Sequence, residues 1–117
     1  MLEDMLSLKR AFSKFSYPKL YFKVIELNLV NYGYWYLMNK DQVLTRKSGL
    51  LERYPSRNLI PFARRDDNDD IACFELAHGK KVFIVHDFAS EGWERRQEFD
   101  SFWTWFISAI NELTETE

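Results

Sequence analysis

The segment LIPFARRDDNDDIACFEL, from Leu59 to Leu76, gathers the acidic side chains that could do chemistry in this chain. Its four closely spaced carboxylates belong to Asp66, Asp67, Asp69 and Asp70. Hard cations such as calcium take oxygen ligands, so the spacing can be compared with that of an EF-hand loop. Counted from Asp66, Ile71 falls on the position that requires glycine and Ala77 on that of the closing glutamate. A calcium loop of this type is therefore excluded.

Besides a metal site of another kind, two interpretations of the four aspartates remain open. Asp and Asn side chains often satisfy backbone groups in tight connections, which would make the segment a solvated turn between two strands. Neighbouring carboxylates can also attract a basic protein partner and steer its association. Asp66, Asp67, Asp69 and Asp70 are therefore candidate partner-binding residues.

The two histidines and the single cysteine do not form a catalytic or metal-binding set. His86 and Asp87 are adjacent in an extended run, where neighbouring side chains point to opposite faces of a sheet. His78 lies in a turn, and we expect structural roles for both histidines. Cys73 lies in an apolar strand, where we expect it to be a small buried residue. The chain also lacks a nucleophile elbow, a P-loop and a dinucleotide fingerprint. We therefore expect no enzyme activity, no catalytic residue, no bound metal and no cofactor.

Apolar periodicity predicts four helices. The predicted ranges are Leu2 to about Phe15, Pro18 to Leu27, Asp41 to Tyr54, and a last helix after Asp100 or Ser101. The apolar stripe of the last helix is expected to contain Phe99, Phe102, Trp103, Phe106, Ile107, Ile110 and Leu113. Trp105 falls off this stripe, so it either marks an interface or packs beneath the N-terminal helices. Trp105 is therefore a further candidate for partner binding.

Four strands are predicted from β-rich runs. They span Tyr34 to Met38, Leu59 to Ala63, Ile71 to Leu76, and Lys80 to Phe88. Pro61 lacks a backbone N–H, which suggests an edge position or a β-bulge in its strand. The last run is apolar on both faces, so we expect a central strand there. The segment ERRQE, from Glu94 to Glu98, is expected to be a charged connection to the last helix.

A loop tryptophan follows the last predicted strand. Trp93 lies between Gly92 and Glu94, in a segment that also contains Glu91. A tryptophan in such a loop either anchors the loop or contacts a partner. Glu91, Trp93 and Glu94 are therefore candidate partner-binding residues.

The whole chain of 117 residues suits one domain, residues 1–117, and 17% of its residues are aromatic. No apolar run approaches the roughly 20 residues needed to span a bilayer, and the N-terminus does not resemble a signal peptide. One cysteine excludes an internal disulfide and fits a reducing compartment. We therefore expect a cytoplasmic protein without a membrane partner. Three successive strands followed by a helix, without βαβ alternation, indicate the α+β class.

Charge is unevenly distributed along the sequence. Residues 1–57 hold ten Lys or Arg and five Asp or Glu, a net +5, whereas residues 58–117 hold six and thirteen, a net −7. Nucleic-acid binding needs clustered basic residues, so the acidic half disfavours direct contact with nucleic acid. A basic protein partner suits it better.

Four segments together resemble the SUKH superfamily, which includes fungal cell-wall-assembly regulators and many bacterial immunity proteins. They are YPKLYFKVIE (Tyr17 to Glu26), LIPFARRDDNDDIACFE (Leu59 to Glu75), KVFIVHDF (Lys81 to Phe88) and FDSFWTWFISAI (Phe99 to Ile110). They are similar to that family's proline-led helix, its two strands joined by an acidic loop, its later strand and its closing helix. The resemblance implies a twisted, mostly antiparallel sheet packed against N-terminal helices and a C-terminal aromatic helix. It implies no shared catalytic residues.

For a bacterial member, the resemblance implies direct binding that neutralises a cognate toxin, often a nuclease or a deaminase. Together with the acidic half, it predicts an immunity-type protein that docks a basic toxin domain. The alternative is a regulatory interaction domain with a cellular client, in which the acidic loop is only a solvated turn. A small hydrolase would need a metal at the aspartates or a pocket that contains His86 and Asp87.

Overall fold

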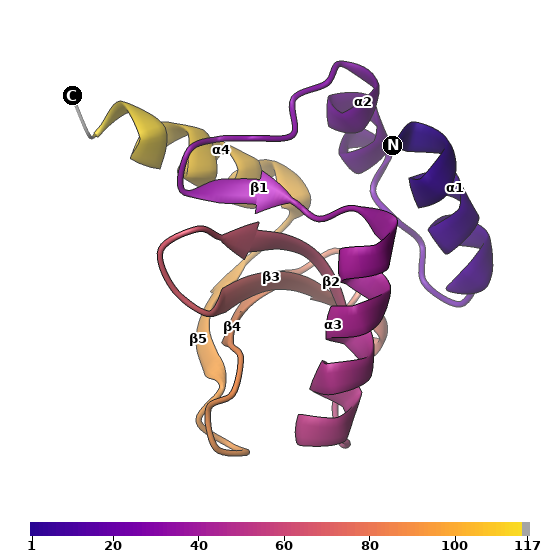
Figure 1. The fold of residues 1–117 in the computed structure, drawn as a ribbon, viewed down its shortest axis with the longest axis vertical. Coiled ribbons are helices and arrows are strands. Elements are labelled where there is room, and N and C mark those ends of the chain that lie inside the picture. The colour runs from indigo at the N-terminus through magenta and orange to yellow at the C-terminus, as the bar shows by residue number, and fades with distance from the viewer. Residues whose placement is uncertain (116–117) are drawn as a thin grey trace.

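The computed structural model describes residues 1–115, which form four α-helices, one 3-10 helix and five strands (Figure 1). The helices are α1 (Leu2–Ala11), α2 (Lys19–Glu26), α3 (Lys40–Arg53), η1 (Leu76–His78) and α4 (Phe102–Thr114). The strands are β1 (Trp35–Leu37), β2 (Leu59–Arg65), β3 (Asp70–Glu75), β4 (Val82–His86) and β5 (Arg95–Phe99). No helix within residues 1–115 is long and apolar enough to cross a bilayer.

The five strands form one sheet in the order β1-β2-β3-β4-β5, and every neighbouring pair is antiparallel. The α+β class predicted from the sequence is therefore confirmed. The register of β2 against β3 shifts between Pro61 and Ala63, which is the bulge expected at the proline. β4 lies between β3 and β5, in agreement with its apolar character on both faces.

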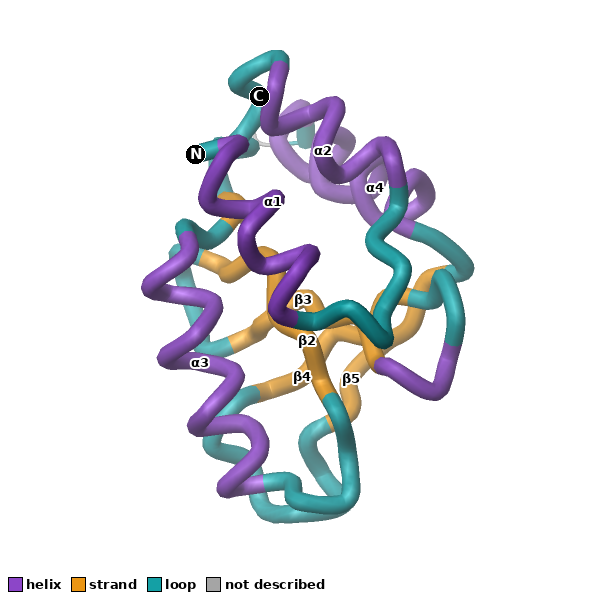
Figure 2. The backbone as a smooth tube through the Cα atoms, turned by 90° about the vertical axis from the view of Figure 1, so that its right-hand side faces the viewer, coloured by secondary structure: helices purple, strands orange, loops and turns teal. Residues whose placement is uncertain are grey.

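An aromatic core covers one face of the sheet. Phe62 on β2 stacks on Phe74 on β3, with ring centroids 4.4 Å apart. Phe102 and Trp105 of α4 pack on the Phe62 ring at 5.5 and 4.9 Å, and Tyr21 of α2 packs on it at 6.1 Å. Figure 2 shows α2 and α4 together on one side of the strands and α3 on another side, where α3 packs against β2.

Local signals in the sequence explain the buried side of α2 and the two ends of α3. In α2, Tyr21, Val24 and Ile25 lie on one side of the helix and are buried. The Asn39 side chain accepts a hydrogen bond from the Gln42 N–H, and the Gln42 side chain accepts one from the Asn39 N–H. This reciprocal cap starts α3. The helix ends at Arg53, two residues before Pro55, as the proline predicts.

Several predicted elements are longer than the observed ones. The run predicted to end at Phe88, for example, is a strand only along Val82–His86. α1 ends at Ala11, whereas the sequence predicted a helix to about Phe15. Phe15 instead lies in the following turn, where its ring stacks on Phe74 with centroids 5.0 Å apart. Phe15 therefore belongs to the core without belonging to the helix, whose buried residues are Met5 and Leu8. The first strand is Trp35–Leu37 rather than Tyr34 to Met38.

The segment predicted as a charged connection is a strand. β5 pairs with β4 along Arg95–Phe99, although four of its five residues are exposed. Its Glu98 side chain forms ion pairs with Arg95 of the same strand at 2.7 Å and with Lys81, just before β4, at 3.3 Å. No apolar alternation marks such an edge strand, because its stability comes from backbone pairing and neighbouring charges.

The orientation of α4 corrects the predicted apolar stripe. Phe102, Trp105 and Ala109 are buried, whereas Trp103 and Ile107 are 54% and 37% exposed. The predicted cap at Ser101 is present. The helix turns Trp105 inward because this ring fills the space beside Phe62, so the stripe drawn through Trp103 and Ile107 was wrong.

Candidate functional site

The loop between β4 and β5, residues 87–94, exposes two large aromatic side chains. Phe88 is 60% exposed and Trp93 is 81% exposed. Phe88 has φ +71° and Gly92 has φ +95°. Positive φ is ordinary for glycine but strained for a phenylalanine. The loop therefore holds Phe88 outward in a backbone conformation that the residue itself does not favour.

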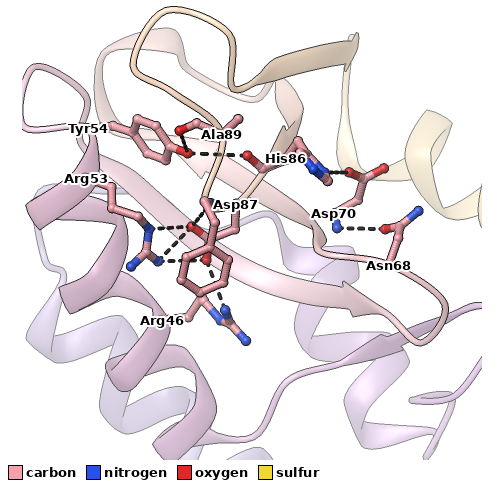
Figure 3. A network of polar contacts seen from close by, with 9 residues as sticks. Arg46, Arg53, Tyr54, Asn68, Asp70, His86, Asp87 and Ala89 are labelled. Atoms are coloured by element: carbon pink, nitrogen blue, oxygen red, sulfur yellow. Dashed lines mark hydrogen bonds and ion pairs between the residues drawn. The ribbon is translucent and has the colours of Figure 1, made fainter.

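Asp87 fixes the first end of this loop. Its buried carboxylate accepts hydrogen bonds from Arg53 Nε and an Arg53 terminal nitrogen at 2.7 and 2.8 Å, and from Arg46 at 3.0 Å. Figure 3 shows both arginines reaching Asp87 from the neighbouring helix, α3. The Phe88 N–H also donates to Asp87, at 2.9 Å. These charge-assisted bonds fix the backbone at the point where the chain turns out of β4.

The same arginines support the exposed ring. The Arg53 guanidinium lies 4.1 Å from the centre of the Phe88 ring, and that of Arg46 lies 5.7 Å from it. Cation–π contact of this kind orients the ring without burying it. The Tyr54 hydroxyl donates to the carbonyl of Ala89 at 2.8 Å and lies 3.3 Å from that of His86, which holds the next part of the loop (Figure 3).

Glu94 fixes the other end. Its carboxylate accepts hydrogen bonds from the Arg57 guanidinium at 3.0 Å and from the Gly92 N–H at 2.6 Å. Arg57 also donates two hydrogen bonds to the Glu75 carboxylate, at 2.9 and 3.0 Å. The Glu94 carbonyl accepts the His86 N–H at 2.7 Å, which joins the two ends. Burial raises the pKa of Glu94, but backbone N–H donors and Arg57 outweigh burial, so its pKa lies below the ordinary value.

The acidic turn, residues 66–69 between β2 and β3, lies beside the first end of this loop. The Asp87 N–H donates to the Asp69 carbonyl at 3.1 Å, and Asp70 and His86 are opposite each other in the sheet. Asp70 Oδ1 lies 2.9 Å from His86 Nδ1 and 3.0 Å from Arg96 Nε. The structure therefore brings together two candidate segments that the sequence places about 20 residues apart.

Neighbouring cations neutralise part of the acidic turn. Arg65 contacts the two Asp67 oxygens at 2.7 and 3.0 Å and also pairs with Glu112 at 2.6 Å. The Arg65 hydrogen bond holds the pKa of Asp67 below its usual range. Within residues 1–115, Asp66 and Asp69 have no cation at ion-pair distance, so they present the uncompensated charge of the turn.

Five of the eight predicted partner-binding residues are exposed: Asp66, Asp67, Asp69, Glu91 and Trp93. Three are not. Asp70 and Glu94 are 8% and 6% exposed and serve in the ion pairs described above, and Trp105, at 1%, belongs to the core. The assignment of Trp105 to an accessible surface is therefore corrected, because a fully buried ring cannot contact a partner in this conformation.

Sequence reasoning missed Phe88 and the arginines beneath it. Arg46 and Arg53 are two helical turns apart on α3, so their spacing puts them on one face of a helix. That spacing was a usable signal for a paired basic site. No feature of the neighbouring sequence indicates that Phe88 is exposed, because it ends an apolar run whose other apolar residues are buried.

The residues that the sequence offered for bond-making chemistry are not brought together. Within residues 1–115, no group of three or more His, Cys, Asp or Glu side chains is placed to hold a metal ion. His86 faces Asp70 whereas Asp87 faces α3, as expected for adjacent strand residues (Figure 3). Cys73 is fully buried, and burial raises the pKa of its thiol. Comparison with protein families, curated proteins and solved structures finds no match to this chain.

Proposed function

We propose that this chain is a non-enzymatic protein-binding domain whose contact surface is the β4–β5 loop with the adjoining acidic turn. The observation that carries the proposal is the exposure of Phe88 and Trp93, at 60% and 81%, in a loop held at both ends by the ion pairs of buried carboxylates. Large exposed rings on a fixed backbone are typical of residues that dominate binding energy at protein interfaces.

Preorganisation strengthens this argument. A loop that must become ordered on binding loses conformational entropy, which subtracts from the affinity. Here Asp87 and Glu94 already fix the loop through Arg46, Arg53 and Arg57. A partner would therefore meet aromatic side chains whose backbone is already in place.

The partner class that fits best is a basic protein, and we assign the chain to the immunity type. In this role it acts in a bacterial cytoplasm and binds a cognate toxin, of the nuclease or deaminase class, at its basic active site. Support comes from the SUKH resemblance and from Asp66 and Asp69, whose carboxylates have no cation at ion-pair distance within residues 1–115. Neighbouring carboxylates can imitate phosphate and accelerate association with a basic surface.

The first experiment identifies and then challenges the partner. The tagged chain captures its partner from native cytoplasm, and the product of the adjacent gene is tested first, as the candidate toxin. With the purified partner, Phe88→Ala combined with Trp93→Ala is expected to weaken binding about 100-fold or more, since tryptophan is a hot-spot residue and phenylalanine is enriched at interfaces. Leu27→Ala, at a 56% exposed position beyond α2, is the matched control and should bind normally. Equal binding by the double variant would contradict the proposal.

The acidic turn is tested through kinetics. Asp66→Asn, Asp67→Asn and Asp69→Asn together should leave the fold intact by circular dichroism while slowing association with the toxin. The effect should be largest at low salt, because exposed charges are screened as ionic strength rises. Unchanged association kinetics at low salt would exclude an electrostatic role for the turn.

One observation favours a second candidate function, a regulatory domain with a cellular client. Arg65 pairs with Asp67, and His86 and Arg96 contact Asp70, so two of the four aspartates between residues 66 and 70 are compensated within the fold. A turn used in this way needs no basic partner. In that case the triple Asn variant binds the client normally, the aromatic double variant does not, and no toxin gene lies beside the gene for this chain.

A further inference from the structure

A separate recess lies where α3 passes the start of β2, at the end of the β2–β3 hairpin remote from the acidic turn. It has a volume of about 240 Å³. Its wall is formed by residues 11–15 at the end of α1 and beyond it, by Lys47 of α3, by Asn58 and Ile60 around the start of β2, and by Leu76 of η1. None of these residues belongs to the β4–β5 loop or to the acidic turn, so the recess is independent of the proposed binding surface.

The recess is mainly apolar where it meets the core. Phe15 and Ile60, which are 5% and 2% exposed, form its inner part, and Phe12 and Leu76 are partly exposed at its sides. Phe15 is fixed by its stacking on Phe74, so this inner part is continuous with the aromatic core. An apolar group could therefore rest on a rigid surface there.

Lys47 places a positive charge in this apolar setting. Its ammonium donates to Asn58 Oδ1 at 3.0 Å and to the Leu59 carbonyl at 3.3 Å, and it lies 5.2 Å from the centre of the Phe12 ring. All three are neutral partners. An ammonium has three donors, so these contacts leave one N–H for another acceptor.

No carboxylate compensates this charge. Among residues 1–115, no Asp or Glu lies within ion-pair distance of Lys47, and no acidic residue lines the recess, whereas Lys14 does line it. Cys73 lies near Lys47, but burial raises the pKa of its thiol, so it is neutral at physiological pH. Burial also lowers the pKa of Lys47, which reflects a charge partly removed from water.

We propose that this recess binds a small amphipathic carboxylate, with its apolar body against Phe15 and Ile60 and its carboxylate on the Lys47 ammonium. The recess favours an anionic ligand, because two lysines and no acidic residue are among the residues that line it. The volume of about 240 Å³ selects a small molecule rather than a folded partner. Lys14 supplies a second positive charge at the edge.

The test uses 4-phenylbutyrate as a probe, titrated into the full chain while amide signals are followed by NMR. We expect saturable shifts at residues 11–15, at Lys47 and at Leu76. The neutral isostere 4-phenylbutanamide should bind about tenfold more weakly or worse, because it lacks the charge-assisted hydrogen bond to Lys47. This comparison uses the unaltered chain, so it does not depend on the stability of any variant.

Variants then assign the charge to one residue. Lys47→Met keeps the length of the side chain and should weaken binding of the carboxylate about tenfold, with little effect on the amide. Lys19→Met, on the exposed side of α2, is the matched control and should bind as the unaltered chain does. Absence of saturable shifts, equal affinity for carboxylate and amide, or shifts outside the recess would each overturn the proposal. None of these results bears on the β4–β5 loop.

Discussion

Phe88 combines an exposed ring with a backbone conformation that glycine prefers. At φ +71° the side chain adds about 1–2 kcal/mol of strain that glycine would not carry. Alanine keeps the strain and loses the contact with Arg53. We therefore expect Phe88→Gly to be more stable than Phe88→Ala by about 1 kcal/mol, measured by urea denaturation.

Leu51 provides the matched control for this comparison. It lies inside α3 and is 52% exposed. In a helix interior, glycine is about 1 kcal/mol less favourable than alanine. Leu51→Ala should thus be more stable than Leu51→Gly, the reverse of the order at Phe88. If both positions favoured alanine, the strain at Phe88 would be disproved.

Asp87 is the residue on which the first end of the loop depends. Replacement by asparagine removes the charge that Arg46 and Arg53 share, while their side chains remain only 20% and 28% exposed. We expect Asp87→Asn to lower the free energy of unfolding by about 3 kcal/mol, the low end for a broken buried pair. The low end applies because both guanidinium groups keep some contact with water.

Chemical denaturation measures this loss, and the exposed pair of Lys23 and Glu26 serves as the control. Its side chains are 57% and 59% exposed. Glu26→Gln should change stability by less than about 0.5 kcal/mol. A change below about 1 kcal/mol for Asp87→Asn would show that the loop does not depend on this contact.

At the scale of elements, the β4–β5 loop is expected to loosen in acid. The pKa of Glu94 in the folded chain lies below its ordinary value of 4.5. Ionised Glu94 therefore stabilises the fold above that value, and this contribution is lost as the pH falls through the folded pKa. Glu94→Gln should be less stable than the unaltered chain at pH 7.

The pH profile separates this effect from a general loss of stability. Between about pH 6 and pH 3, the free energy of unfolding of Glu94→Gln should fall less than that of the unaltered chain. Glu26→Gln, at an exposed helical position, should follow the unaltered profile. Parallel profiles for Glu94→Gln and the unaltered chain would contradict the assignment.

The orientation of α4 gives a further prediction. Trp105→Ala should lower the free energy of unfolding by about 4 kcal/mol, because it empties the space between Phe62 and Trp35. Trp103→Ala, at a 54% exposed position on the same helix, should lower it by less than about 1 kcal/mol. Thermal or urea denaturation of both variants checks the orientation. Equal losses would favour the stripe predicted from the sequence.

The predicted elements succeeded where the sequence carries a one-sided pattern. α2 has a clear apolar face and α3 has its Asn39 cap, so both lie close to the predicted ranges. β5 has neither signal. It is stabilised by backbone pairing with β4 and by the ion pairs of Glu98, which leave no apolar pattern in the sequence. The stripe of α4 failed for another reason: the helix has apolar residues on several sides, and only the sheet decides which side is buried.

At the scale of the molecule, part of the charge asymmetry is used inside the fold. Arg46, Arg53 and Arg57 belong to the basic half of the sequence, and the carboxylates that they hold belong to the acidic half. Those carboxylates are Asp87, Glu75 and Glu94. The net −7 of the second half is thus a poor measure of the charge that a partner would meet.

The candidate site was predictable only in outline. Trp93 and the acidic turn were identified from residue type and position in loops. The contact between the acidic turn and Asp87 could not be predicted from the sequence, because it depends on the register that sets Asp70 opposite His86. Long-range ion pairs such as Arg53 with Asp87 also leave no local pattern.

The order of the strands has a consequence for how the chain acquires its fold. Each strand pairs with the next strand in the sequence, and no strand enters between two others. Pairing therefore closes short loops, whose entropy loss is small, everywhere except across α3. Residues 66–69 close the shortest of these loops, with Asn68 Oδ1 accepting the Asp70 N–H at 2.7 Å. The acidic turn is thus a place where the sheet can begin to form, whatever it later binds.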